Sequence, residues 1–265
     1  MGDPRAAAHA QDGHRVRLEW GPTGGAAVAA GADVAVVVDV LSFTTTLTLA
    51  VERGIAVHPY RWKDERAAEY AASLGAVLAV GRFEQRELGG SAVSLSPAAM
   101  AGGHGVEGVE RLVLPSPNGS TICAALAGAG ALVVGACLRN RRAVAAWLAP
   151  QLAAGATAAV VPAGERWPDG SLRPAAEDLW GAGAVLAALT GLDRVADGDL
   201  SPEALLARDA YLAAEPRLAE ALAGCAGGQE LAAVGFADDV SVAAELDLSD
   251  VVPLLGPDGA FRPGA

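Results

Sequence analysis

The stretch VAVVVDVLSFTTTL, residues 34–47, decides the fold class. From Val34 to Leu41 the chain is apolar at every position except Asp39, near the end of the run. A run without polar alternation is typical of a strand buried on both faces of a parallel sheet. The next segment, Thr44 to Arg53, has helical spacing and stops at Gly54, a common signal after the end of a helix. The stretch therefore predicts a buried strand, a hydroxyl-rich turn and a helix.

The same alternation of strand and helix continues along the chain. Further strands are predicted at residues 16–20, 55–60, 76–80, 111–115, 131–136, 157–164 and 251–255. Helices are predicted at residues 64–73, 118–128, 139–152 and 174–189, with several more between 201 and 246. Strands that alternate with helices of this length form βαβ units. The chain is therefore predicted to be an α/β protein with a mostly parallel or mixed sheet covered by helices on both faces.

Two segments are predicted to lack regular structure. Residues 21–31 are rich in Gly and Ala and read as a loop, and residues 162–174 form an irregular charged loop that could serve as a lid. We divide the chain into an N-terminal strand and loop, residues 1–30, and one compact domain, residues 31–265. No break in composition divides the larger part.

Composition narrows the classes of partner. The 265 residues are 52% hydrophobic and 19% charged, and the net charge is −12, which disfavours binding to a nucleic acid. The N-terminal residues lack the apolar core of a secretory signal, and Gly128 and Gly130 interrupt the charge-free stretch at residues 121–138. We expect a cytoplasmic protein with a small anionic substrate and no membrane partner. A homodimer is compatible with the sequence.

The candidate site residues follow predicted strands, because ligands of such sheets bind beyond the carboxyl ends of the strands. Asp39 can be a magnesium ligand or a nucleophile, and it can equally be an ordinary turn residue. Thr45 and Thr46 stand where a helix begins, and Asn118, Gly119 and Ser120 open another; both helix starts can bind an anion. The plainer interpretation of each is a helix cap.

A third group lies at the start of the helix predicted from Pro174. Glu177 and Asp178 are adjacent carboxylates that can hold a metal or simply complement the helix dipole. Asn140 follows the strand at residues 131–136 and can orient a polar ligand. The four histidines are scattered, and no nucleotide-binding or zinc motif is present in the sequence.

Together these motifs resemble the 2-phosphosulfolactate phosphatase family. The resemblance rests on VVVDVLSFTTTL, PSPNGST, CLRNRRAVA, AGERWPDGSLRPAAEDLWGAG and GFADDVSVAAELDLSDVVPLL, which occur in the family's order between Asp33 and Leu255. It implies a three-layer α/β/α fold and a Mg²⁺-dependent phosphatase that releases phosphate from 2-phosphosulfolactate, a step of coenzyme M biosynthesis. On this basis we expect Asp39, Glu177 and Asp178 to be catalytic and to hold Mg²⁺. We expect the substrate-binding residues to be Thr45, Thr46, Asn118, Gly119, Ser120 and Asn140.

Four positions depart from the family's pattern. The family usually has Arg where Ser42 stands and Glu where Arg82 stands, and Leu95 and Ala99 replace an amide and a carboxylate. These departures predict altered substrate contacts, and phosphosulfolactate would then be a poor substrate compared with another small phosphorylated acid. The alternative is a non-catalytic family member that binds an anionic metabolite.

Overall fold

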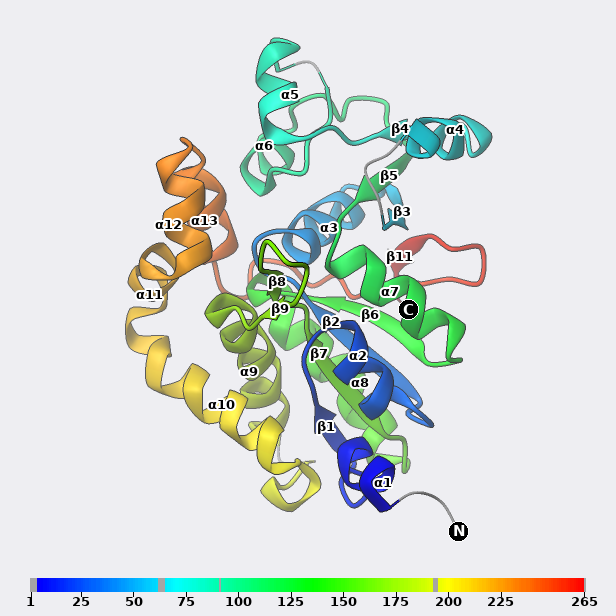
Figure 1. Ribbon diagram of the computed structural model, residues 1–265, viewed down its shortest axis with the longest axis vertical. Helices are drawn as coiled ribbons and strands as arrows, with labels where there is room; N and C mark the ends of the chain where they lie inside the picture. Colours follow the sequence, from blue (N-terminus) through cyan, green and yellow to red (C-terminus); the bar gives the residue numbers. More distant parts are fainter. Residues whose placement is uncertain (1–3, 62–64, 91, 193–194, 265) are drawn as a thin grey trace.

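The computed structural model describes residues 4–61, 65–90, 92–192 and 195–264. Within these ranges a nine-stranded sheet has the order β1-β7-β2-β6-β10-β11-β3-β5-β4 (Figure 1). The strands are β1 (Val16–Leu18), β2 (Val34–Val38), β3 (Ala56–Tyr60), β4 (Val77–Leu78), β5 (Arg111–Pro115), β6 (Leu132–Ala136), β7 (Ala158–Pro162), β10 (Pro253–Leu255) and β11 (Phe261–Pro263). The strands predicted from the apolar runs are confirmed, although β4 is only two residues long.

Two parallel groups of strands make up the sheet. β1, β7, β2 and β6 pair in parallel, and so do β3, β5 and β4. The antiparallel hairpin β10–β11 lies between the groups, where β10 pairs with β6 and β11 pairs with β3. The sheet is therefore mixed and mostly parallel.

The central strand β2 shows how the two faces are covered. Val34, Val36 and Val38 belong to a core shared with helices α8 (Arg141–Ala153), α9 (Ala176–Thr190) and α10 (Pro202–Ala214). The alternate residues Ala35 and Val37 belong to a second core with α2 (Gly21–Ala29), α3 (Phe43–Glu52) and α7 (Gly119–Gly128). Because side chains alternate across a strand, an entirely apolar strand supplies both cores. The result is an α/β/α arrangement of three layers, as expected.

The remaining helices surround this centre. They are α1 (Pro4–Ala10), α4 (Glu65–Ser73), α5 (Arg82–Glu87), α6 (Pro97–Ala101), α11 (Leu218–Gly224), α12 (Ala226–Ala233) and α13 (Ala237–Ala243), and Figure 1 shows α11–α13 in orange tones beside the sheet. None of the helices that the structure describes is long and apolar enough to cross a membrane.

The prediction of a loop at residues 21–31 is wrong, because residues 21–29 form helix α2. Pro22 stands at the start of this helix, a position that proline favours. The small residues allow close packing on the sheet: a Cβ atom on Gly25 would lie 2.8 Å from Val161 Cγ1. Tertiary packing thus overrides the low helix propensity of glycine. β1 pairs with β7 of the same sheet, so residues 16–18 of the predicted N-terminal segment contribute to the main fold.

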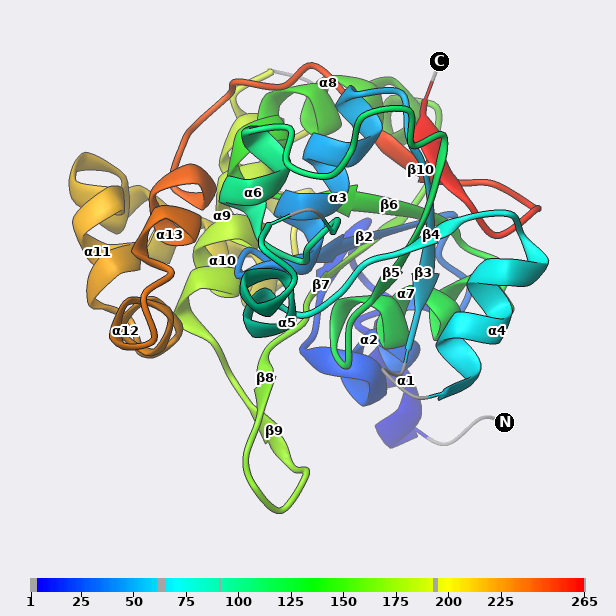
Figure 2. The same ribbon diagram turned by 90° about the horizontal axis from the view of Figure 1, so that it is seen from above.

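The charged segment between β7 and α9 is also more regular than predicted. Glu165–Arg166 (β8) and Leu172–Arg173 (β9) pair as an antiparallel hairpin. Figure 2 shows this hairpin projecting from the body of the molecule. Its first residue, Glu165, directly follows the Ala163–Gly164 turn, which places the base of the hairpin beside the ends of the central strands.

Candidate active site

Asp39 directly follows β2 and is held by two backbone donors from different helices. Its Oδ1 accepts the N–H of Phe43 at 3.1 Å, and its Oδ2 accepts the N–H of Gly119 at 3.0 Å. The side chain is buried. Phe43 begins α3 and Gly119 begins α7, so the carboxylate lies against the positive ends of two helices.

Gly119 is required by this close approach. A Cβ atom at this position would lie 2.7 Å from Asp39 Oδ2 and 2.4 Å from the Phe43 ring, both closer than real contacts allow. The glycine of the Asn-Gly turn therefore lets the backbone reach the carboxylate. From the sequence alone, this helix start is predicted to bind an anion.

Asp178 is a second buried acid near Asp39, and it too is held by backbone N–H groups. Its Oδ1 accepts the N–H of Val40 at 2.7 Å, and its Oδ2 accepts the N–H of Gly164 at 2.9 Å. The neighbouring Glu177 is also buried, and its Oε2 atom has no hydrogen-bond partner. An unpaired carboxylate oxygen in the interior is costly, which makes Glu177 the carboxylate best able to accept a further ligand.

The electrostatics show that these acids are crowded. Burial raises the pKa of Asp39 to about 6; the N–H groups of Phe43 and Gly119 oppose the rise, and the charges of Glu165 and Glu177 add to it. Burial also raises the pKa of Asp178 well above its usual range, with further contributions from Asp39 and Glu177. A bound divalent cation would relieve this repulsion.

Among the described residues, no group of three or more His, Cys, Asp or Glu side chains is arranged so that it could hold a metal ion. A magnesium ion here would therefore have at most two carboxylate ligands from the protein. Mg²⁺ is usually held by one or two carboxylates, with water and substrate phosphate completing its octahedron. The unpartnered oxygen of Glu177 and the raised pKa of Asp39 agree with such a site.

A cavity of about 150 Å³ opens beside Asp39. Its polar lining comes from the turns after β2 and β5, from the N-terminus of α5 and from the base of the β8–β9 hairpin. The described lining residues are Asp39, Leu41, Ser42, Phe43, Arg82, Leu95, Pro115, Ser116, Pro117, Asn118 and Glu165. Asn118 Nδ2 donates to Glu165 Oε1 at 2.9 Å, which fixes the amide at the cavity wall.

Four of the predicted substrate-binding side chains are fully buried and bind the backbone instead. Thr45 Oγ1 donates to the carbonyl of Val40, and Thr46 Oγ1 donates to that of Leu95. Ser120 Oγ donates to the carbonyl of Leu114 at 3.0 Å. The same holds for Asn140, whose Nδ2 donates to the carbonyls of Gly135 and Val251 and whose Oδ1 accepts the N–H of Cys137. Thr45, Thr46, Ser120 and Asn140 therefore shape the turns and do not line the cavity.

Sequence reasoning did not assign roles to Glu165, Arg82 and Asp239. Glu165 lies three residues after the end of β7, so the strand-end rule that selected Asp39 could also have found it. Arg82 comes from α5, and its Nε atom donates to Asp239 Oδ2 at 2.5 Å, 157 residues further along the chain. No local pattern in the sequence indicates that contact.

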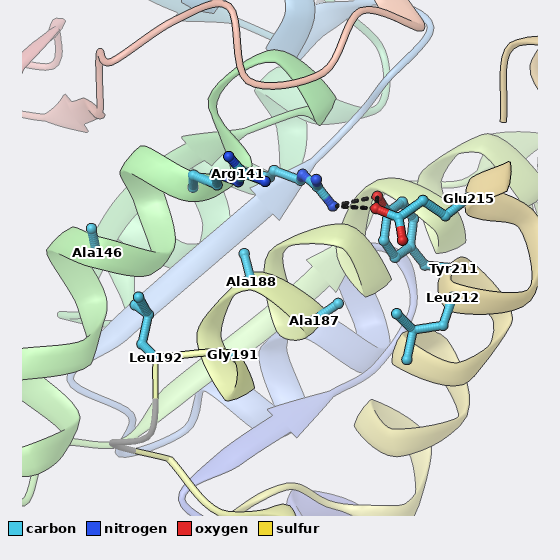
Figure 3. Close-up of a pocket in the computed structure, with 10 residues that line it drawn as sticks. Arg141, Ala146, Ala187, Ala188, Gly191, Leu192, Tyr211, Leu212 and Glu215 are labelled. Atoms are coloured by element: carbon cyan, nitrogen blue, oxygen red, sulfur yellow. Dashed lines mark hydrogen bonds and ion pairs between the residues drawn. The ribbon is translucent and has the colours of Figure 1, made fainter.

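A larger groove lies between α8, α9 and α10, away from the predicted site residues. Its volume is about 440 Å³, and its described lining includes Arg141, Tyr211 and Glu215 (Figure 3). Arg141 pairs with Glu215 at 3.2 Å and with Asp247 at 3.0 Å. Because these carboxylates already neutralise Arg141, the groove is a poor site for an anionic substrate.

Comparison with known proteins agrees with this geometry. The family model for 2-phosphosulpholactate phosphatase matches residues 26–257, most of the chain. A protein from Deinococcus radiodurans, described as a probable 2-phosphosulfolactate phosphatase, is 32% identical over 238 residues, which cover 88% of this chain and 92% of that protein.

An α/β sheet with acids gathered at its strand ends, together with these matches, defines the chain as a phosphatase. It belongs to the 2-phosphosulfolactate phosphatase family.

Proposed function

We propose that this protein is a Mg²⁺-dependent phosphatase that hydrolyses the phosphate monoester of a small acid. By family analogy the substrate is 2-phosphosulfolactate, the products are sulfolactate and phosphate, and the pathway is coenzyme M biosynthesis. The observation that carries the proposal is the cavity beside Asp39, which joins a buried carboxylate to a polar wall at the strand ends. Its volume of about 150 Å³ suits a small substrate.

Asp39 and Glu177 would hold the metal, with Asp178 positioning the backbone around them. Asp178 binds the N–H groups of Val40 and Gly164, so it ties the turn after β2 to the turn after β7. When bound, Mg²⁺ would neutralise charge on the phosphoryl oxygens and lower the pKa of a bound water. Attack by water and attack by Asp39 are both compatible with this arrangement.

The polar wall would receive the phosphoryl group. Asn118 has a side-chain amide fixed by Glu165, and the first turn of α7 follows it. N–H groups in the first turn of a helix lack intrahelical partners and favour anions. Gly119 already donates to Asp39, so the donor left for the substrate on this wall is the side-chain amide of Asn118.

The test is phosphate release measured with and without Mg²⁺. The panel contains phosphosulfolactate, phosphoglycolate, phospholactate and the phosphoglycerates, and chelator-treated enzyme serves as the control. We expect release that depends on Mg²⁺ and is lost in Asp39→Asn. If none of these compounds releases phosphate while one of them binds, the protein is instead a non-catalytic member of the family that binds an anionic metabolite.

A further inference from the structure

Arg82 is the one cationic residue among the described residues that line the Asp39 cavity. The same lining contains the carboxylates of Asp39 and Glu165. An anionic substrate that enters this space meets two like charges, so it needs a compensating cation. Arg82 lies in the wall and can supply that charge.

The guanidinium of Arg82 is held in a fixed orientation by two partners. Its Nε donates to Asp239 Oδ2 at 2.5 Å, and its Nη2 donates to the hydroxyl of Ser42. The Asp239 side chain is 1% exposed, whereas that of Arg82 is 18% exposed. Among the contacts of the described residues, none uses Nη1. The edge of the guanidinium that carries Nε and Nη2 is therefore bound within the protein, and Nη1 is left for a ligand.

Asp239 is itself fixed from a third direction. Its Oδ1 accepts the N–H of Ala98 at 3.1 Å and the hydroxyl of Ser96, at the start of α6. The carboxylate of Asp239 in α13 thus connects α5 with α6 and fixes the orientation of the Arg82 guanidinium. Such anchoring lowers the entropy that an arginine loses on binding an anion.

A purely structural role for Arg82 is the alternative, with the ion pair serving only to join α5 to α13. A neighbouring residue already makes that connection. Arg86, one turn along α5, donates to the carbonyl of Gly235 at 2.5 Å and lies 3.9 Å over the ring of Phe236. Phe83 adds an edge-to-face contact with the same ring. Arg82 lies farther from this ring, at 5.8 Å, and lines the cavity, whereas Arg86 does not.

We propose that Arg82 binds the acid group of the substrate, a carboxylate or sulfonate carried beside the phosphate. This proposal rests on the proposed function. Asp39, Asn118 and the start of α7 form the phosphoryl side of the cavity, while Arg82 reaches it from α5 beside Ser42. A planar guanidinium with a free Nη1 suits the oxygens of a carboxylate or sulfonate. Arg82 is thus a specificity-determining residue that distinguishes phosphorylated acids from simple alkyl phosphates.

The kinetic test compares phosphoglycolate with ethyl phosphate, which has the same two carbons and lacks the carboxylate. In Arg82→Gln we expect kcat/KM for phosphoglycolate to fall about 10- to 100-fold, mainly through KM, as for loss of a hydrogen bond to a charged group. For ethyl phosphate we expect kcat/KM to change by less than about threefold, because this substrate has no acid group for the guanidinium to bind. Arg82→Lys keeps the positive charge but lacks the planar guanidinium, so we expect an intermediate loss of kcat/KM for phosphoglycolate.

Arg86→Gln is the matched control, since it removes an arginine of the same helix outside the cavity. It should lower the melting temperature and leave the ratio of the two kcat/KM values unchanged. An equal fall for both substrates in Arg82→Gln would assign Arg82 to the phosphoryl group or to the fold and overturn the proposal. An unchanged ratio in both Arg82 variants would overturn it as well.

A binding measurement separates this proposal from the proposed function. Sulfoacetate carries both acid types and no phosphate, and its binding to wild type and to Arg82→Lys and Arg82→Gln is followed by calorimetry. Binding that weakens about 10-fold or more in Arg82→Gln supports the assignment even if wild type releases no phosphate from any substrate. Equal binding to wild type and Arg82→Gln, or no binding to wild type, would contradict it even in an active phosphatase.

Discussion

Gly119 donates its backbone N–H to Asp39 Oδ2 over 3.0 Å, although 80 residues separate the two in the chain. The contact joins the turn after β2 to the first turn of α7. It also brings together two parts of the cavity lining, because Asn118 precedes Gly119 and Ser42 lies in the turn that contains Asp39. The geometry of the site therefore depends on a backbone atom at a position where no side chain fits.

Replacement of Gly119 by Ala should damage both stability and activity. The new Cβ would lie 2.7 Å from Asp39 Oδ2, so the helix start or the carboxylate must move. We expect a loss of about 1–3 kcal/mol in the free energy of unfolding, typical of overpacking, with a large fall in kcat. Gly128→Ala, at the other end of α7, is the control because nothing lies within 4 Å of its added Cβ. Similar effects of the two variants on unfolding and turnover would refute this explanation.

Asp39→Asn should lower turnover by roughly two orders of magnitude or more, as for groups that stabilise charge in a transition state. The chain should remain folded but less stable, because the new amide group must face one of the two N–H donors from Phe43 and Gly119. Steady-state kinetics measure the first effect and circular dichroism the second. Activity near that of wild type would remove Asp39 from the mechanism.

Glu177→Gln should raise the Mg²⁺ concentration needed for half-maximal activity. Its Oε2 atom is buried without a partner, so a metal ligand is the role that explains it best. Asp178→Asn should act mainly on stability, since both of its oxygens bind backbone N–H groups. Magnesium titrations of activity and of thermal unfolding measure the two effects. An unchanged Mg²⁺ requirement in both variants would leave these acids a helix-dipole role only.

Stability without metal should fall as the pH rises from about 4 to about 6. The pKa of Asp39 is raised from 3.8 to about 6, so in this range the native state holds a proton that the unfolded state has released. The free energy of unfolding then decreases with pH, by about 3 kcal/mol for this group, and Asp178 acts in the same direction. Added Mg²⁺ should therefore stabilise the protein more at pH 7 than at pH 4.5.

Denaturant unfolding with chelator and with Mg²⁺ at each pH measures this difference. Comparing the two at the same pH cancels groups such as His58, whose pKa is lowered chiefly by burial. A magnesium effect that stays constant over this pH range would show that the buried acids do not bind the ion.

The central strands and the order of the motifs could be predicted from the sequence because burial on both faces leaves an unbroken apolar run. Helix α2 could not be predicted, because its Gly and Ala residues have small side chains that allow close contact with β7, and glycine has a low helix propensity. The polar positions after the strands drew attention to Asp39 and Asn118, which line the cavity. Propensity and position cannot show, however, which hydroxyls donate to backbone carbonyls. Those of Thr45 and Thr46 do so.

The contact between Arg82 and Ser42 was beyond sequence reasoning for a similar reason. The two residues are 40 positions apart, and the turn and helix that bring them together are set by tertiary packing. Family resemblance leads one to expect arginine at position 42, and the guanidinium of Arg82 lies against that serine. Poor activity on phosphosulfolactate remains a prediction, because Leu95 and Ala99 still depart from the family's pattern. Comparison of kcat/KM across the substrate panel now decides between phosphosulfolactate and the other acids.

The β10–β11 hairpin has a consequence for how the chain folds during its synthesis. Residues 253–263 pair with β6 on one side and β3 on the other, so in the described sheet this segment joins the two parallel groups of strands. The pairing strands are separated by more than 100 residues in sequence, and contacts of such long range form late. A nascent chain that has not yet released this segment from the ribosome exposes the facing edges of β3 and β6. Until then those two edges are available for mispairing, and we expect ribosome-bound chains to need chaperone protection there.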